Sequence, residues 1–223
     1  MAKSKAKERA DSLYRQLEQM AIPSGADGDE DTSSLVSLQG RPILPAVDSS
    51  RLLRMKKFRF QLMHQWLVQN FDPCKAADIG GGKGLLAYLL QKSGWEATVI
   101  DPVDQALPEK YKDLSSGARV KIKPGEAVKR LGVEFESEQA DGFDLLIGMH
   151  AHACNVKIID AAARFGCGFV LFPCCVIGEP FYPPLGVHWL ESLADYALRK
   201  GRPIQPIRLN FKGQNIGLVS LKG

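Results

Sequence analysis

The stretch AADIGGGKGLLAYLL at residues 76–90 decides the fold. A short apolar run leads into a glycine loop, and an apolar stretch with helical spacing follows the loop at once. The loop carries an acid and three glycines at alternating positions, Asp78, Gly80, Gly82 and Gly84. Glycines permit positive φ angles and let a ligand approach the backbone closely, while the amides at the start of a helix are free to donate hydrogen bonds to it. The stretch therefore predicts a strand, a ligand-binding turn around Gly81 and a helix.

The chain after this stretch alternates between short apolar runs and helical patterns, which is typical of βα units with a parallel sheet. The predicted strands are 76–79, 97–100, 119–122, 143–149, 169–172, 204–211 and 214–221. The predicted helices are 84–93, 126–131, 155–165 and 188–200. Because the gap between the last two strands is too short for a helix, these strands should form a hairpin, and one of them must run antiparallel.

Two more helices are predicted before this region. Residues 7–20 and residues 51–70 both repeat apolar side chains with helical spacing, and Ser49 or Ser50 would cap the second helix. Between them, SGADGDEDTSS at residues 24–34 has acidic and small residues but no large apolar ones, which is typical of a flexible linker. We therefore expect an N-terminal helix and an acidic linker over residues 1–50, followed by one α/β domain over residues 51–223.

Length and composition indicate a folded chain with one domain and an extension. It has 223 residues, of which 45% are hydrophobic and 24% charged, and its formal net charge is +4. No apolar run reaches the roughly 18 to 20 residues that a membrane helix needs, and no apolar segment follows the charged start MAKSKAKERA. Five cysteines, an odd number with two of them adjacent, favour a reducing compartment. We expect a cytoplasmic protein without a membrane segment.

A second acid supports a nucleotide-like ligand at the glycine loop. Asp101 ends the second predicted strand 23 residues beyond Asp78, close to the roughly 20 residues at which a carboxylate accepts hydrogen bonds from ribose hydroxyls. Glu126 comes just past the third predicted strand, where it would meet an adenine edge. A solvated helix start is the alternative interpretation of Glu126. On these residues alone, a dinucleotide and S-adenosylmethionine both remain open.

Residues 76–221 resemble class I S-adenosylmethionine-dependent methyltransferases. Three features carry the resemblance: the pattern hydrophobic-Asp-x-Gly-x-Gly-x-Gly, the acid that ends the second strand, and the terminal hairpin. The resemblance implies an α/β fold, with a Rossmann-like, seven-stranded, mostly parallel sheet, a terminal antiparallel hairpin and helices on both faces. It also implies S-adenosyl-L-methionine as the cofactor, with the glycine loop beside its methionine part and Asp101 on its ribose. The predicted cofactor site consists of Asp78, Gly80, Gly81, Gly82, Gly84, Asp101, Pro102, Glu126 and Met149. Lys83 departs from the pattern and would suit a pyrophosphate, which keeps a nicotinamide or flavin enzyme open.

Histidines and cysteines follow the fourth and fifth predicted strands, in DLLIGMHAHACN (residues 144–155) and FVLFPCCVIGEP (residues 169–180). Because the carboxyl ends of parallel strands meet at one edge of a sheet, these side chains should crowd the mouth of one pocket. The motif pair partly resembles a methyltransferase subgroup that includes acceptor-stem tRNA ribose methyltransferases. The candidate catalytic residues are His150, His152, Cys174 and Cys175.

Four hypotheses compete for this cluster. His150 or His152 would be a general base that orients a substrate OH or NH toward the methyl group. Imidazole and thiolate ligands would suit zinc, but adjacent cysteines on a continuing strand point to opposite sides, so no metal is expected. Cys174 or Cys175 would be a nucleophile on a pyrimidine ring. In the fourth hypothesis the cysteines only pack the end of the strand.

Basic residues before the first strand point to RNA as the substrate. Five cations lie within residues 51–59, interleaved with Phe58, and Phe60 follows them. Cations with nearby aromatic rings follow a phosphate backbone and stack on bases, and the lysines of the N-terminal helix would extend that surface. A solvated helix face is the alternative. We expect methyl transfer to RNA, with tRNA among the candidates. A small-molecule or protein methyltransferase and a noncatalytic RNA-binding scaffold stay open, and no oligomeric state follows from the sequence.

Overall fold

The structure is a computed structural model that describes residues 2–21 and 58–222. The predicted acidic linker at residues 24–34, the predicted cap at Ser49 or Ser50 and most of the basic segment, residues 51–57, lie outside the described residues. None of the helices in the described part is long and apolar enough to cross a membrane.

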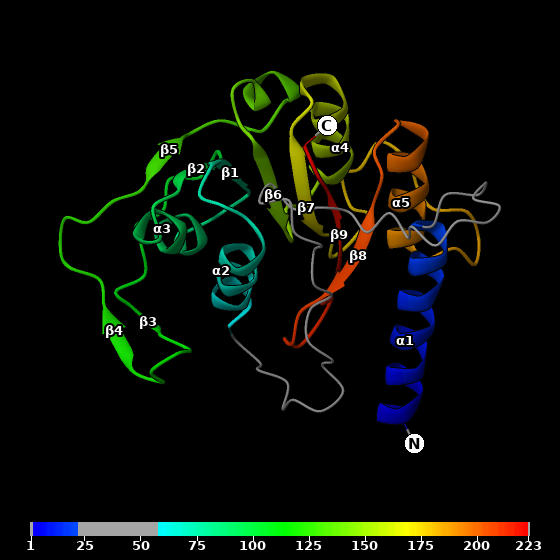
Figure 1. Cartoon of the computed structure of the whole chain (residues 1–223), viewed down its shortest axis with the longest axis horizontal. Coiled ribbons are helices and arrows are strands. Elements are labelled where there is room, and N and C mark those ends of the chain that lie inside the picture. The colour runs from blue at the N-terminus through cyan, green and yellow to red at the C-terminus, as the bar shows by residue number, and fades with distance from the viewer. Residues whose placement is uncertain (1, 22–57, 223) are drawn as a thin grey trace.

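A seven-stranded sheet forms the centre of the molecule (Figure 1). Its spatial order is β5 (Lys129–Leu131), β2 (Glu96–Ile100), β1 (Lys75–Ile79), β6 (Leu145–Met149), β7 (Gly168–Phe172), β9 (Ile216–Ser220) and β8 (Gln205–Arg208). All neighbours pair in parallel except β9, which is antiparallel to both β7 and β8. The predicted mostly parallel sheet with a terminal antiparallel hairpin is confirmed.

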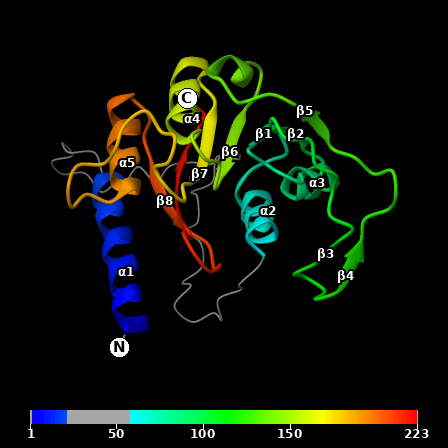
Figure 2. The same ribbon diagram turned by 180° about the vertical axis from the view of Figure 1, so that it is seen from behind.

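Helices cover both faces of the sheet, as predicted (Figures 1 and 2). One face packs against α2 (Arg59–Asn70) and α3 (Leu85–Lys92), and the other packs against α1 (Ala2–Ala21), α4 (Asn155–Phe165) and α5 (Trp189–Arg199). Side chains on β1 alternate between the two layers, since Ala76 belongs to the first cluster whereas Ala77 and Ile79 belong to the second. A sheet buried on both faces explains why the strands read as continuous apolar runs.

The region between β2 and β6 was predicted wrongly. Residues 119–122 were expected to form the third parallel strand, but β4 (Arg119–Lys121) pairs only with β3 (Lys110–Lys112) in a separate two-stranded hairpin. Residues 126–131 were expected to be a helix, but they contain β5, which pairs in parallel with β2. The sequences of β4 (RVK) and β5 (KRL) are both short and mostly polar. Neither sequence has the apolar pattern by which a strand of a central sheet is distinguished from a strand of a surface hairpin.

The N-terminal helix α1 is part of the main core. Leu17 is fully buried, and Leu13 is also buried in the cluster that contains α4 and α5. Tyr14 Oη donates a hydrogen bond to the carbonyl of Pro206 at 3.1 Å, and Asp11 forms an ion pair with Arg208 at 2.5 Å. Both partners of α1 lie on β8, so the helix closes the β8 side of the molecule. The division of the chain at residue 50 stays a prediction.

The docking of α1 predicts a large stability effect for a residue far from the sheet edge that carries the glycine loop. Leu17→Ala should lower the free energy of unfolding by about 2–5 kcal/mol, because it leaves a cavity between α1 and the core. Gln16→Ala, at an exposed position of the same helix, is the matched control and should change the free energy by less than about 0.5 kcal/mol. Urea unfolding measures both. Equal stability of the two variants would show that α1 does not belong to the cooperative unit.

Candidate active site

The glycine loop is a tight turn at the carboxyl end of β1. Gly80, Gly82 and Gly84 have φ angles of +63°, +54° and +75°, in the left-handed region where residues with a side chain are strained. A Cβ at Gly84 would lie 2.8 Å from Val128 Cγ2, and one at Gly80 would lie 3.1 Å from Ala151 Cβ. The loop therefore needs glycine both for its backbone angles and for its contact with the loop that follows β6.

Asp78 places a buried carboxylate under this turn. The side chain is 1% exposed, and its Oδ2 has no hydrogen-bond partner. A Cβ at Gly81 would lie 2.6 Å from Oδ2, so glycine at that position keeps the carboxylate in place. Burial raises the pKa of Asp78 to about 7, against the opposing effects of the Ala87 backbone and Arg130. A buried polar atom without a partner is costly, which indicates that a ligand donor belongs beside it.

Asp101 fixes the other side of the loop. Its Oδ2 accepts a hydrogen bond from the Gly82 amide at 2.8 Å, and its Oδ1 accepts one from the Val103 amide at 2.9 Å. Arg130 donates to the Gly82 carbonyl at 2.8 Å and to the Gln105 carbonyl at 3.2 Å. The end of β2 and the middle of β5 are thus both tied to the glycine loop. Sequence reasoning missed Arg130, because a polar edge strand gives no sign of what its side chains contact.

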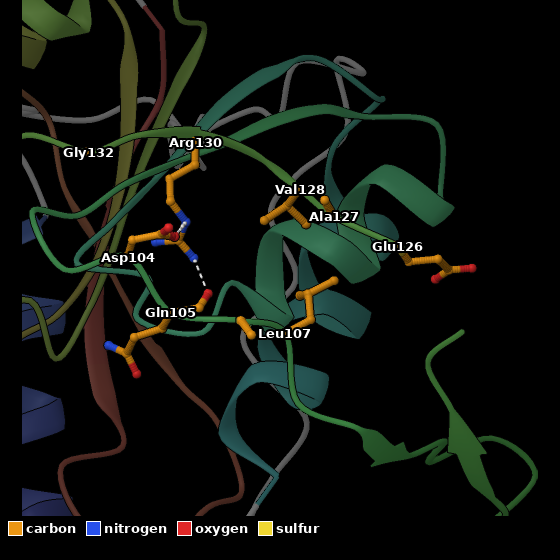
Figure 3. Close-up of a pocket in the computed structure, with 9 residues that line it drawn as sticks. Asp104, Gln105, Leu107, Glu126, Ala127, Val128, Arg130 and Gly132 are labelled. Carbon is orange, nitrogen blue, oxygen red and sulfur yellow. Dashed lines mark hydrogen bonds and ion pairs between the residues drawn. The ribbon is translucent and has the colours of Figure 1, made fainter. Parts of the chain in front are cut away.

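A cavity of about 560 Å³ opens next to these residues (Figure 3). Asp104, Gln105 and Leu107 line it from the segment after β2, and Val128 and Arg130 line it from β5 and the residues before it. Arg130 also forms an ion pair with Asp104 at 3.5 Å. The cavity lies beside the Asp101 end of the glycine loop and has room for a ring system. Pro102, predicted for the cofactor site, is exposed at the start of the same segment.

Glu126 stands apart from the glycine loop. It forms an ion pair with Lys92 at 3.2 Å, at the end of α3, and hydrogen bonds to Tyr88 and Lys92 lower its pKa. It is a lining residue of the cavity, but in Figure 3 its side chain points away from Asp104 and Arg130. The strand that Glu126 was expected to follow is β4 of the separate hairpin, and Glu126 precedes β5. Its predicted contact with an adenine edge stays a prediction.

The loop after β6 carries His150 opposite the glycine loop. His150 has a φ of +60° and donates its amide to the Phe172 carbonyl at 3.0 Å. Its ring lies 6.0 Å from the ring of Phe211, and its Nε2 is buried without a partner. Burial lowers the pKa of His150 to about 4, and the positive charge of Arg59 acts in the same direction. Met149, the last residue of β6, is buried in the core. Its predicted cofactor contact stays a prediction.

The structure brings His152, Cys174 and Cys175 together. His152 Nδ1 lies 3.1 Å from Cys175 Sγ, and the two sulfur atoms are 3.7 Å apart. The adjacent cysteines were expected to point to opposite sides only if the strand continued through them, and it does not. β7 ends at Phe172 and Pro173 begins a loop, so the alternation of strand side chains no longer applies. Burial and the neighbouring Cys175 raise the pKa of Cys174 to about 11, which disfavours Cys174 as a ready thiolate nucleophile.

A buried glutamate, which sequence reasoning missed, joins the two loops. Glu179 is 7% exposed, and its carboxylate accepts hydrogen bonds from the amides of Asn155 and Val156 at 2.9 and 3.1 Å and from the Asn155 side chain at 2.6 Å. These amides belong to the start of α4, where a negative charge is favourable. Two residues in this region, His150 and Ala153, have positive φ angles. Glu179 therefore holds a strained loop in place, and nothing in GEPFYPP distinguishes it from a surface acid.

Similar proteins were found for part of the chain. Two curated relatives, each named probable tRNA (uracil-O(2)-)-methyltransferase, come from Caenorhabditis briggsae and Caenorhabditis elegans. Each is 33% identical to this chain over 103 residues, which make up 46% of this chain but only 17% of the relative. No protein-family model matches the chain.

Solved structures of methyltransferases are similar to the chain at low identity. A methyltransferase from Methanosarcina mazei has a TM-score of 0.40 at 16% identity and covers 66% of this chain and 91% of its own. The tRNA (uracil-54, C5)-methyltransferase of Pyrococcus abyssi, solved with S-adenosyl-L-homocysteine, has a TM-score of 0.39 at 12% identity and covers 76% of this chain and 39% of its own. The sheet itself is mostly parallel, with the single antiparallel strand β9 between β7 and β8. The chain has an α/β fold with a Rossmann-like, mostly parallel, seven-stranded sheet.

The residues at the carboxyl edge of this sheet fit S-adenosylmethionine. Asp78 Oδ2 lacks a donor and would suit the ammonium group of the methionine part. Gly80 to Gly82 leave the backbone open to close approach, since a Cβ at Gly82 would meet nothing nearer than Gln105 at 3.9 Å. Asp101 and the neighbouring cavity supply a carboxylate and space for the nucleoside. A pyrophosphate would instead be repelled by these two buried acids.

Asp78 predicts how the stability of the ligand-free protein depends on pH. Its pKa is about 7 in the folded state against 3.8 as a reference, so the folded state binds the additional proton between these values. The free energy of unfolding should therefore fall as the pH rises through this window, by about 1 kcal/mol between pH 6 and pH 8. In Asp78→Asn this contribution should be absent. Urea unfolding of both proteins at the two pH values tests this, and identical pH dependence would contradict it.

Glu179 predicts a stability effect that a surface acid does not have. Glu179→Gln should lower the free energy of unfolding by about 1–3 kcal/mol, because an amide cannot accept all the hydrogen bonds that the carboxylate accepts. The control is Glu138→Gln, which removes only an exposed ion pair with Arg164 and should cost less than about 1 kcal/mol. Thermal and urea unfolding compare the two variants. A smaller loss for Glu179→Gln than for Glu138→Gln would show that the two loops are not joined in this way.

Proposed function

We propose that this protein is an S-adenosylmethionine-dependent methyltransferase that acts on RNA. The observation that carries the proposal is the convergence of three features at one edge of the sheet. These are the unpartnered Oδ2 of Asp78, the glycine loop bonded to Asp101, and the unpartnered Nε2 of His150 on the facing loop. The partial relatives named as tRNA methyltransferases support RNA as the substrate, although the match spans only 17% of their length.

Some residues of this edge would bind the cofactor, and others would bind the methyl acceptor. Asp78, Gly80 to Gly82 and Asp101 would hold the cofactor, which supplies a methyl group activated by a sulfonium. The close approach of Gly80 to Ala151 sets the loop that carries His150 directly against the cofactor side. Positioning of the acceptor supplies most of the acceleration, because the methyl group is already activated.

His150 would orient the acceptor. Its Nε2 is buried and has no partner, so it is available to accept a hydrogen bond from an acceptor hydroxyl. Phe211 flanks the ring on one side, and Arg59 adds positive charge nearby. This arrangement favours a hydroxyl within a negatively charged chain, such as RNA. The names of the relatives also specify an oxygen as the methylated atom.

The surroundings of the edge are suited to a large substrate. The N-terminal half of α1, which carries the exposed Lys7 and Arg9, extends beyond the sheet on the side of the β8–β9 connection (Figure 1). The loop after Cys175 exposes Tyr182 and Leu185, which are 72% and 106% exposed. Cations with an exposed aromatic ring suit phosphates and stacked bases.

All five cysteines are free, which supports a reducing compartment, and we place the protein in the cytoplasm.

Methyl transfer with labelled S-adenosylmethionine tests the proposal. The purified protein should transfer label to a tRNA fraction and not to peptides or small metabolites. Asp101→Ala should abolish binding of S-adenosylmethionine, since it removes a ribose acceptor and frees the Gly82 amide. His150→Ala should keep cofactor binding but lower turnover about 100-fold. This factor is at the lower end of the range of rate enhancements that a general base contributes.

The control variant for both is Asp195→Asn, which changes an exposed acid on α5 that pairs only locally with Arg199. It should keep full binding and turnover. Label on peptides or metabolites but not on RNA would contradict the substrate class. Cofactor binding without transfer to any substrate would indicate a noncatalytic scaffold, and undiminished turnover in a folded His150→Ala would remove His150 from the mechanism.

A further inference from the structure

The cluster of His152, Cys174 and Cys175 has the donor atoms and the spacing of a zinc site. One donor atom from each residue lies within 4.8 Å of the others, and this is the only such group of histidine, cysteine or acidic side chains in the described part of the chain. The donors come from the loop after β6 and the loop after β7, which meet at the carboxyl edge of the sheet. Histidine nitrogen and cysteine sulfur are the ligands that zinc prefers over oxygen-binding ions.

The distances agree with a tetrahedral ion. With Zn–S of about 2.3 Å and Zn–N of about 2.0–2.1 Å, tetrahedral ligands place sulfurs about 3.8 Å apart and nitrogen about 3.6 Å from each sulfur. The observed separation of the sulfurs is 3.7 Å. His152 Nδ1 lies 3.1 Å from Cys175 Sγ and 3.8 Å from Cys174 Sγ. The three atoms therefore occupy three corners of the required tetrahedron after shifts of about half an ångström.

The loops that carry the ligands are held together independently of any ion. Glu179, four residues after Cys175, is hydrogen-bonded to the amides of Asn155 and Val156, which follow His152 along the chain. A Cβ at Gly178 would lie 2.7 Å from Ala153 Cβ, so the two loops are also in direct contact. A preorganised ligand set loses little entropy when the ion binds. His152 is exposed, which gives an ion access from solvent.

We propose that His152, Cys174 and Cys175 bind one Zn²⁺, with the fourth coordination position taken by water or by an oxygen of the substrate. Both thiols lose their protons to solvent when the ion binds, and no oxidation state changes. Three protein ligands and one open position are typical of reactive rather than purely structural zinc sites. The site adjoins His150 on the same loop, so the ion would lie beside the acceptor position of the proposed methyltransferase.

Cobalt substitution tests the site without any measurement of activity. The full-length protein is stripped of metal with a chelator, kept reduced with a phosphine, and titrated with Co²⁺ while its absorption spectrum is recorded. One equivalent of Co²⁺ per protein should produce a thiolate-to-cobalt charge-transfer band and the intense visible bands of tetrahedral Co²⁺. Zn²⁺ should then displace Co²⁺, because zinc binds such ligands more tightly.

Single variants identify the ligands. Cys174→Ser, Cys175→Ser and His152→Ala should each lower Zn²⁺ affinity at least about 100-fold, more than the 10- to 100-fold loss caused by changing an outer residue of a metal site. Cys74→Ser is the matched control, because Cys74 is half-buried at the amino end of β1, away from the carboxyl edge that carries the cluster. The Zn²⁺ affinity of this variant should equal that of the wild type. Circular dichroism verifies folding, and Cys174→Ala and Cys175→Ala replace any serine variant that fails to fold.

Two results would overturn the proposal. One is a stripped wild-type protein that shows no thiolate-to-cobalt band. The other is a band that persists unchanged in Cys174→Ser and Cys175→Ser. Failure of the methyltransferase proposal would leave both readouts unaffected, since neither depends on cofactor or RNA.

Discussion

A buried carboxylate at the end of β1 is the constraint on which the site depends. Asp78 lies in the centre of the sheet, paired in register with Val99 on one side and Ile147 on the other, and its Oδ2 has no partner. Burying such a group is unfavourable unless a ligand later supplies the missing donor. The glycine loop above it leaves room for that ligand, because a side chain at Gly81 would collide with the carboxylate. The fold therefore sacrifices stability at the point where we propose that the cofactor binds.

The surrounding elements hold this edge rigid from both sides. Asp101 attaches the end of β2 to Gly82, and Arg130 attaches β5 to the same residue. Glu179 attaches the loop after β7 to the start of α4. The glycine loop and the His150 loop touch at Gly80 and Ala151. As a result, groups that are far apart in the sequence share one edge: the glycine loop with Asp78 and Asp101, His150 with its unpartnered Nε2, and the cluster of His152, Cys174 and Cys175.

Those parts of the fold with strong local patterns were predictable from the sequence. The strand that carries Asp78, its glycine turn and the position of Asp101 follow from apolar runs and conformational requirements of glycine. β3, β4 and β5 were not predictable, because short polar strands such as KYK, RVK and KRL owe their places to pairing partners rather than to their own side chains. This error also placed Glu126 after a strand of the main sheet, whereas it lies between β4 and β5.

The site was predictable in its residue types but not in its contacts. His152, Cys174 and Cys175 were expected at one edge, yet their common orientation depends on β7 ending before Pro173. The roles of Glu179 and Arg130 arise only from tertiary contacts, since nothing local distinguishes a buried capping acid or a loop-binding arginine from solvated ones.

Calorimetric titration of the purified protein with S-adenosylhomocysteine, with NADH as the control ligand, tests the central claim most directly. If the free oxygen of Asp78 receives a donor from the ligand, the homocysteine compound alone should bind, and near pH 7 its binding should release protons from Asp78. The measured enthalpy should then vary with the ionisation enthalpy of the buffer in the wild type but not in Asp78→Asn. Binding of NADH instead, or no binding of either compound, would contradict the assignment of this sheet edge to S-adenosylmethionine.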